Sequence, residues 1–373
     1  MLTRYLASQI RKDLLRKMVF VGGPRQVGKT TLAKSLLPDN SNNEGYLSWD
    51  IAEQRERILK KEFYASPLWI FDEIHKYRFW RNYLKGIYDN KNQQQQILVT
   101  GSARLDYYRF SGDSLQGRYY YLRLHPLSLA ELNSNSPDDL MSLLTLGGFP
   151  EPFFSSSEIE AKRWSREYRN RLIREDLVQL EKVHDLGNLE LLALRLPELV
   201  GSPLSINALR EDLQLSHKTV ALWLKIFERL YAIFRIAPFG APKIRAVKKE
   251  QKHYHFDWSL IPEMSLRFEN LVACALLKWV HYRQDAYGED LELNYFRDVD
   301  GREVDFVIVL QKKPVTLIEC KWNDADISPA LKYLKIRFPA CDAWQISAIG
   351  KKNFVDELGI RVCPATEFLS DLI

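Results

Sequence analysis

The chain has 373 residues, of which 46% are hydrophobic and 27% are charged, and its formal net charge is +5 at pH 7. This length predicts two or three domains with ordinary apolar cores. The mild positive charge permits nucleic-acid binding but does not require it. The four cysteines form no C-x-x-C pair, which argues against a zinc site or a disulfide framework. Without a visible signal peptide or membrane-length apolar run, we expect a cytoplasmic protein with no membrane partner.

A phosphate-binding loop is the strongest motif in the chain. Residues 23–30 match G-x-x-x-x-G-K-[ST] without a mismatch, between an apolar strand-like run at 18–21 and a helical pattern that ends at Pro38. Glycines let successive N–H groups point at phosphate oxygens, Lys29 adds charge at the β- and γ-phosphates, and the Thr30 hydroxyl suits Mg²⁺. We expect ATP to bind at Gly23, Pro24, Arg25, Gln26, Val27, Gly28, Lys29, Thr30 and Thr31. A chance Gly-Lys-Thr turn is the alternative, which both flanks disfavour.

An acidic pair supplies the second part of a nucleotide hydrolase. A second apolar run at 68–71 ends in Asp72 and Glu73. Asp72 is predicted to hold Mg²⁺, usually through water, and Glu73 to polarise the attacking water. A third run at 97–100 is followed by Gly101 and Ser102, and the Ser102 hydroxyl is a candidate to sense the γ-phosphate. An ordinary strand-to-loop turn is the alternative at that position.

The predicted strands define the fold class of the first domain. Residues 46–50 and 119–124 complete a set of five strands, with helical stretches between several of them. This alternation predicts an α/β domain with a parallel sheet covered by helices on both faces.

The order of these motifs resembles that of the predicted AAA+-superfamily ATPases of bacteria and archaea. The resemblance rests on residues 23–31, Phe-Asp-Glu-Ile-His-Lys at 71–76, Thr-Gly-Ser-Ala-Arg at 100–104, and the two segments at 114–118 and 125–132. It implies a P-loop ATPase core at 1–132 and a C-terminal region with a restriction-endonuclease-like core at 261–373. Assembly like such ATPases implies a homo-oligomer and an arginine finger. Arg118 is the first candidate and Arg104 the second, with a surface or interface ion pair as the alternative.

The middle of the chain is predicted to contain a helical lid or linker at 133–190 and a winged-helix module at 191–260. Helical segments at 205–213 and after Ser216 are followed by strand-like runs at 232–236 and 253–257. Between these runs lies a basic hairpin candidate at 240–249. Such a module can place a helix in the major groove of double-stranded DNA and a hairpin on phosphates, or it can act only as a packing module. A basic helix near 160–175 is interpreted as solvated and laced with ion pairs.

The C-terminal region carries a second constellation of charges. Asp305 interrupts one apolar strand, and Glu319 and Lys321 lie two apart on the next, so they share a face. Glu269 begins a helix that can add a carboxylate. The set resembles the D…E-x-K arrangement of restriction-endonuclease-like nucleases, which implies Mg²⁺ on Glu269, Asp305 and Glu319, with Lys321 orienting the water. The alternative is an ion-pair cluster in an inert nuclease fold.

Two functions follow from these motifs. The first is an ATPase that couples Mg-ATP turnover to an action on nucleic acid, with a possible metal-dependent nuclease activity. The second is an ATP-dependent switch that acts on protein partners and in which the nuclease-like domain is inert. DNA-stimulated turnover separates them.

Overall fold

The computed structural model describes residues 2–38, 44–101, 105, 115–177, 185–240 and 251–373. The chain divides into two compact units. Unit 1 comprises Met1–His125 with Asp285–Tyr287, and unit 2 comprises Pro126–Gln284 with Gly288–Ile373. Within the described ranges, none of the helices has both the length and the apolar character that crossing a membrane requires.

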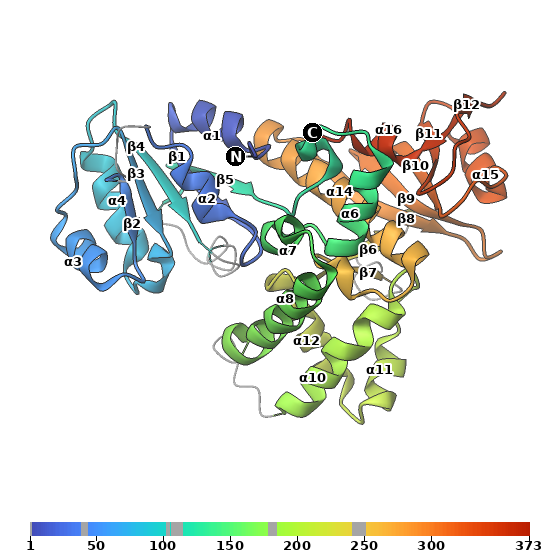
Figure 1. Ribbon diagram of the computed structural model, residues 1–373, viewed down its shortest axis with the longest axis horizontal. Coiled ribbons are helices and arrows are strands. Elements are labelled where there is room, and N and C mark those ends of the chain that lie inside the picture. Colours follow the sequence, from blue (N-terminus) through green and yellow to red (C-terminus); the bar gives the residue numbers. More distant parts are fainter. Residues whose placement is uncertain (1, 39–43, 102–104, 106–114, 178–184, 241–250) are drawn as a thin grey trace. The chain divides into compact units, whose positions relative to one another are not determined.

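Unit 1 is built on a five-stranded sheet with the order β2-β3-β4-β1-β5. Every neighbouring pair is parallel, which confirms the predicted α/β core (Figure 1). The strand that precedes the phosphate loop, β1, is therefore separated from the strand that carries the acidic pair, β3, by β4 alone. The strands are β1 (Met18–Gly22), β2 (Tyr46–Ser48), β3 (Leu68–Asp72), β4 (Gln96–Thr100) and β5 (Tyr119–Arg123).

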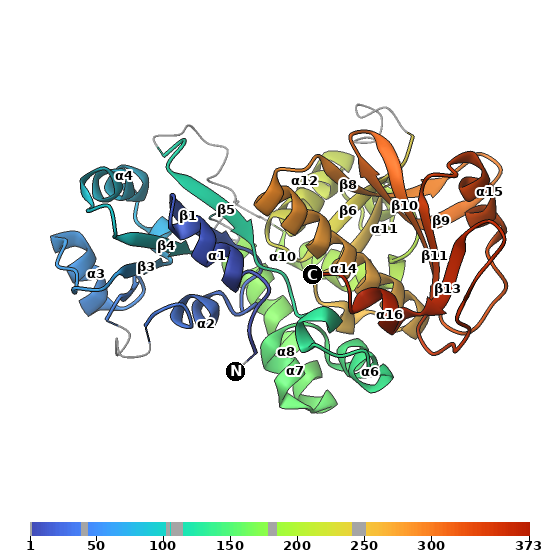
Figure 2. The ribbon, with the colours of Figure 1, turned by 90° about the horizontal axis from the view of Figure 1, so that it is seen from above.

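Successive side chains of a strand point to opposite faces of the sheet. Because these strands are apolar, both faces have side chains to bury, and helices cover both. On one face, Phe20 and Phe71 pack with Trp80 and Leu84 of α4 in a buried cluster. Figure 2 shows α1 and α2 on the side of the sheet opposite to α4. Asp72, one residue after Phe71, therefore faces the side of α2 and the phosphate loop. The helices are α1 (Ala7–Leu14), α2 (Lys29–Lys34), α3 (Ala52–Lys60), η1 (Ile74–Lys76) and α4 (Trp80–Asn90).

Unit 2 contains an eight-stranded mixed sheet with the order β12-β13-β11-β10-β9-β8-β6-β7. Strand β6 pairs antiparallel with β7 and parallel with β8, so the strands predicted in the winged-helix module share one sheet with the C-terminal strands. The domain boundaries at 133, 191 and 261 stay predictions. The strands are β6 (Ile233–Pro238), β7 (Lys252–His255), β8 (Leu291–Arg297), β9 (Glu303–Leu310), β10 (Lys313–Lys321), β11 (Asp342–Ser347), β12 (Phe354–Val355) and β13 (Ile360–Pro364).

The long helix α14 carries a buried lysine whose ammonium is paired. Lys278 of α14 is 1% exposed, and its ammonium donates to the Ser128 hydroxyl at 2.8 Å and to the Glu131 carboxylate. The helices of unit 2 are η2 (Leu129–Leu132), α6 (Pro137–Leu146), α7 (Pro150–Ser155), α8 (Glu158–Arg171), η3 (Leu172–Leu177), α10 (Leu186–Arg195), η4 (Leu196–Leu199), α11 (Ile206–Asp212), α12 (His217–Arg229), η5 (Trp258–Leu260), α14 (Met264–Tyr287, whose last three residues belong to unit 1), α15 (Pro329–Arg337) and α16 (Ala365–Leu369).

Candidate functional site

The backbone of the phosphate loop adopts conformations that require its glycines. Gly23 has φ 133° and Gly28 has φ 95°, both in the region that side chains disfavour. A Cβ on Gly23 would lie 2.3 Å from the Leu124 carbonyl oxygen, so this glycine also permits a close approach to the chain that follows β5. The loop is thus a curled backbone held against the end of β5, the shape that turns N–H groups toward phosphate oxygens.

Lys29 begins α2, and its side chain turns back over the loop. The ammonium donates to the carbonyl oxygens of Gly23 at 3.0 Å and Pro24 at 2.5 Å. The side chain is buried, so its charge acts in a region of low dielectric. The residue therefore provides a positive charge directly above the phosphate loop, as the motif predicts.

Asp72 lies at the end of β3, and three hydroxyl groups donate to its carboxylate. Thr30 donates to Oδ2 at 2.9 Å, Tyr46 donates to Oδ2 at 2.6 Å, and Thr100 donates to Oδ1 at 2.5 Å. Thr30 and Asp72, the two residues predicted to hold Mg²⁺, are therefore in contact. Sequence reasoning missed Tyr46 and Thr100. The available signal was their position on the two strands that flank β3, because Thr100 is the last residue of β4 and Tyr46 is the first residue of β2.

Glu73 follows Asp72 and has a strained backbone. Its φ is 57°, in the left-handed region, and its N–H donates to the Thr100 carbonyl oxygen at 2.9 Å. Its Oε2 lies 3.4 Å from the Lys76 ammonium and 3.6 Å from Nε2 of His75. Burial raises the pKa of Glu73, and the charges of Lys76 and Lys29 oppose that rise. A carboxylate in such surroundings has the proton affinity that suits a general base.

The other residues predicted for this site differ in exposure and in the contacts that the structure shows. Arg25 is half-buried, whereas Thr31 is exposed on α2. The guanidinium of Arg118 pairs with Asp89 of α4 at 2.8 Å, so the structure shows it in an ion pair. Its role as an arginine finger stays a prediction. Ser102 and Arg104 lie outside the described residues.

The second predicted constellation also comes together, in unit 2. Asp305 of β9 accepts a hydrogen bond from the Cys320 N–H of β10 at 2.8 Å. On β10, the Lys321 ammonium lies 2.8 Å from Glu319 Oε1. Glu269 of α14 accepts from the Tyr254 hydroxyl of β7 at 2.8 Å.

A lysine that sequence reasoning missed enters this cluster. Lys252 of β7 is 1% exposed, and its ammonium lies 2.5 Å from Glu303 Oε1 and 3.5 Å from Glu269 Oε1. We name Lys252, Glu269, Glu303, Asp305, Glu319 and Lys321 the carboxylate–lysine cluster. Among the residues that the structure describes, no group of three His, Cys, Asp or Glu side chains has a spacing suited to a metal ion.

Burial dominates the electrostatics of the carboxylate–lysine cluster. It raises the pKa of Glu269 to about 8 and that of Glu319 to about 7, and in each case the charge of Asp305 adds to the rise. Oε2 of Glu319 is buried and accepts no hydrogen bond from the described residues. Near neutral pH, the carboxyl groups of Glu269 and Glu319 therefore retain protons to a large extent, and the two lysines of the cluster add positive charge.

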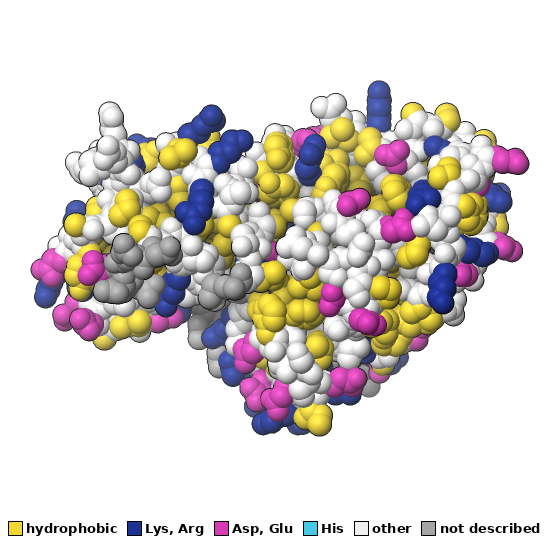
Figure 3. Space-filling view, turned by 45° about the horizontal axis from the view of Figure 1, so that its top comes forward, with side chains coloured by type: hydrophobic (Ala, Val, Ile, Leu, Met, Phe, Trp, Pro, Cys, Tyr) yellow, Lys and Arg dark blue, Asp and Glu magenta, His cyan; other side chains and the backbone are white. Residues whose placement is uncertain are grey.

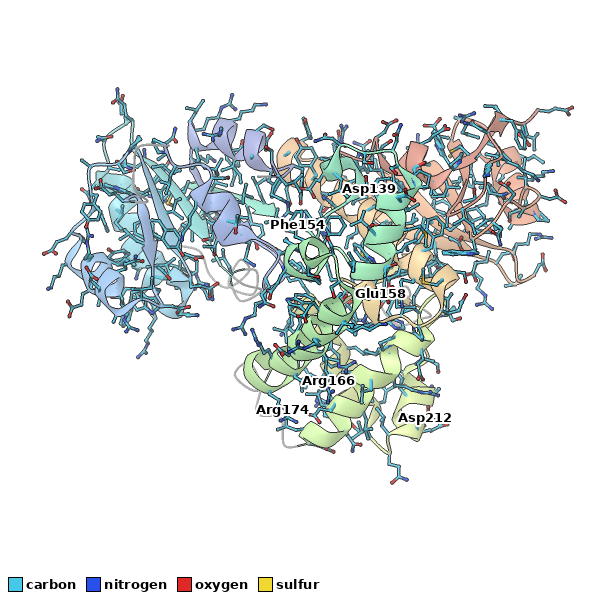
Figure 4. All side chains as sticks on the ribbon, in the orientation of Figure 1. Asp139, Phe154, Glu158, Arg166, Arg174 and Asp212 are labelled. Atoms are coloured by element: carbon cyan, nitrogen blue, oxygen red, sulfur yellow. The ribbon has the colours of Figure 1, made fainter. Side chains whose placement is uncertain are left out.

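The basic surfaces predicted from the sequence are mixed with acids. On α8, Lys162 pairs with Glu158 at 3.3 Å and Arg163 pairs with Glu160 at 2.9 Å, as expected for a solvated helix. Figure 4 labels Glu158 and Arg166 on this helix. Figure 3 shows Lys and Arg interspersed with Asp and Glu on the face that it presents. The basic hairpin candidate lies outside the described residues apart from Gly240, so its predicted DNA contact stays untested.

Family models cover most of the chain in three segments. Residues 15–133 match the model of an AAA domain. Residues 137–270 and 266–368 match two domains of unknown function, DUF8612 and DUF4143. The first match and the parallel-sheet core agree on an AAA+-like, P-loop ATPase domain in the N-terminal region. The restriction-endonuclease-like character of the C-terminal region stays a prediction.

Curated relatives of the chain are uncharacterized. An uncharacterized protein of Mycobacterium tuberculosis is 23% identical over 333 residues, which cover 83% of this chain and 74% of that protein. An uncharacterized protein of Methanocaldococcus jannaschii is 23% identical over 288 residues, which cover 70% of this chain and 63% of that protein. Among solved structures, a signal transduction ATPase with numerous domains (STAND) from Pyrococcus horikoshii, with a tetratricopeptide repeat sensor, has a TM-score of 0.22 and 14% identity. That match covers 76% of this chain and 47% of the other.

We predict that Tyr46→Phe changes the metal dependence of ATP hydrolysis. The substitution removes one of three hydroxyl donors to Asp72, which leaves the carboxylate less firmly oriented. The Mg²⁺ concentration for half-maximal hydrolysis should rise about three- to tenfold, the equivalent of roughly 0.7–1.4 kcal/mol. Nucleotide binding in EDTA should not change. Tyr64→Phe, at an exposed position in the same unit, is the control. An unchanged Mg²⁺ dependence would show that the phenol serves packing alone.

We also predict that the chain loses stability as pH rises from about 4.5 to about 8, because of Glu269. Its pKa is raised in the folded chain, so the folded state retains a proton that the unfolded chain releases in this window. Between pH 5 and pH 8, the unfolding free energy of the wild type should fall by more than that of Glu269→Gln. The difference should exceed about 1.4 kcal/mol, the free-energy equivalent of one pKa unit. Urea titrations at pH 5, 6.5 and 8 measure it, with exposed Glu357→Gln as the control. Equal slopes in wild type and Glu269→Gln would contradict the prediction.

Proposed function

We propose that the protein hydrolyses Mg-ATP at the phosphate loop of unit 1 and uses the hydrolysis cycle as a conformational switch. The observation that carries this proposal is the contact between the Thr30 hydroxyl and the Asp72 carboxylate at 2.9 Å, directly beside Glu73. It joins the phosphate loop to the acidic pair, so both parts of a nucleotide hydrolase share one edge of the sheet.

Each side chain has a distinct role in this proposal. The loop N–H groups from Gly23 to Thr30 and the Lys29 ammonium would hold the phosphates of ATP, and Thr30 with Asp72 would hold Mg²⁺. The bound Mg²⁺ neutralises negative charge on the phosphates. Glu73 orients the water and accepts its proton, since burial raises its affinity for protons. Thr100 connects the two acidic residues, because its hydroxyl donates to Asp72 and its carbonyl oxygen accepts from the Glu73 N–H.

Separate measurements of ATP binding and ATP turnover distinguish the roles of Glu73 and Lys29. Glu73→Gln should slow phosphate release by about 10²- to 10⁴-fold and leave ATP affinity unchanged, because only the water-orienting carboxylate is lost. Lys29→Ala should weaken ATP binding itself. Steady-state phosphate release and calorimetric titration measure the two quantities, with the exposed Glu62→Gln as the control. Wild-type turnover by Glu73→Gln would overturn the assignment of this residue.

For unit 2 we propose that the carboxylate–lysine cluster is a charge-compensated core, without nuclease activity. Lys252 supports this reading, because its buried ammonium already lies between Glu269 and Glu303, and Lys321 pairs with Glu319. Two fixed cations and the raised pKa values remove the negative charge that would attract a divalent cation. The target of the switch would then be a macromolecule that unit 2 binds, either a protein or double-stranded DNA.

Cleavage and stimulation assays test this second proposal. Purified protein should not cut single- or double-stranded DNA with Mg²⁺ or Mn²⁺, whereas Lys252→Met should lower stability by about 3–5 kcal/mol because it leaves buried carboxylates without their counter-charge. Arg297→Met, which removes a half-exposed partner of Glu303, is the matched control. Metal-dependent cutting that Lys321→Ala abolishes would restore the nuclease hypothesis. Salt-sensitive stimulation of ATP turnover by duplex DNA would identify nucleic acid as the target.

A further inference from the structure

Arg4, in the segment that precedes α1, donates a hydrogen bond to the phosphate loop. Arg4 is 8% exposed although it lies close to the N-terminus. Its guanidinium donates to the Val27 carbonyl oxygen from Nη1 at 2.7 Å and to the His125 carbonyl oxygen from Nη2 at 2.5 Å. Hydrogen bonds from a charged donor to buried carbonyl groups are among the stronger bonds in proteins.

Val27 lies within the phosphate loop, between two residues with unusual backbone angles. Its side chain is fully buried, and its neighbours Gln26 and Gly28 both have positive φ angles, 61° and 95°. In a trans peptide group the C=O and the following N–H point in opposite directions. A donor that fixes the Val27 carbonyl therefore also fixes the Gly28 N–H, which then points away from Arg4.

The second carbonyl on the same guanidinium belongs to the last residue before the chain passes into unit 2. The neighbouring Tyr5 reinforces that attachment. Its hydroxyl donates to the Arg123 carbonyl oxygen at 2.5 Å and accepts from the His125 N–H at 3.2 Å. Two consecutive side chains of the N-terminal segment thus hold residues 123–125, and one of them also holds the phosphate loop.

We infer that Arg4 is a positioning residue of the nucleotide site. It orients the Gly28 N–H toward the phosphates through the Val27 carbonyl, and it connects the loop to His125. This role rests on the proposed ATP site. It provides a path by which a structural change in the phosphate loop reaches residues 123–125, which directly precede the first residue of unit 2 in the sequence. A shift of the Val27 carbonyl on phosphate binding changes the bond to Arg4, and the shared guanidinium transmits that change to residues 123–125.

The test uses the full chain, ADP as the probe, and two substitutions at one position. Arg4→Met keeps the length of the side chain and removes all donors, whereas Arg4→Lys keeps the charge but has no planar fork to bridge two carbonyls. Arg4→Met should weaken ADP binding about ten- to hundredfold by calorimetry, and Arg4→Lys should fall between it and wild type. Arg16→Met, at an exposed arginine just after α1, should bind ADP like wild type.

Hydrogen exchange supplies a readout that loss of stability alone would not produce. ADP should protect the amides of residues 119–127 in wild type, and Arg4→Met at saturating ADP should lose that protection. Tyr5→Phe should keep ADP affinity within about twofold and weaken the protection, which also tests the path if Arg4→Met fails to fold.

Two results would overturn the inference. They are a folded Arg4→Met that binds ADP as wild type does, and ADP-dependent protection of 119–127 that persists in Arg4→Met and Tyr5→Phe. A wild-type protein that binds neither ADP nor ATP would instead refute the ATP site itself.

Discussion

The nucleotide site depends on the hydrogen bonds that the Asp72 carboxylate accepts. Three hydroxyl groups from β2, β4 and the first turn of α2 converge on it, so one side chain joins the acidic strand to both of its neighbours and to the phosphate loop. Hydroxyl donors stabilise the anion without neutralising its charge. The strand order makes this possible, because β3 lies between β2 and β4, and β4 in turn pairs with β1, the strand that leads into the phosphate loop.

The two charged centres of the chain solve the problem of buried carboxylates in opposite ways. In unit 1, three hydroxyl groups donate to the Asp72 carboxylate, and carboxylate oxygens are ligands that suit Mg²⁺. In unit 2, the carboxylates of Glu269 and Glu319 face Lys252 and Lys321, and burial raises their pKa values toward or above neutrality. The cations beside the carboxylates of the second centre are its own two lysines. This contrast supports our proposal that the ATP site is the chemically active one.

An ATP site could be predicted from the sequence because its signals are local. The phosphate loop is continuous from Gly23 to Thr30, and the acidic pair directly follows an apolar run, so strand periodicity was sufficient to predict the sheet. The same periodicity placed Asp305 and Glu319 on neighbouring strands. Lys252 was missed because a single lysine directly before the run predicted as a strand at 253–257 resembles a surface residue. Only the tertiary fold places β7 near the helix that carries Glu269.

The residues that were missed share a physical reason. Arg4 binds carbonyl groups 23 and 121 residues away, and no motif marks an arginine that donates to main-chain carbonyl groups far away in the sequence. Motifs report the side chains that touch a ligand, whereas the direction of a backbone N–H is set by whatever holds the preceding carbonyl. In this loop the Val27 carbonyl oxygen accepts from Arg4, a donor 23 residues away. We infer that the same guanidinium, which also donates to the His125 carbonyl oxygen, couples the direction of the Gly28 N–H to residues 123–125.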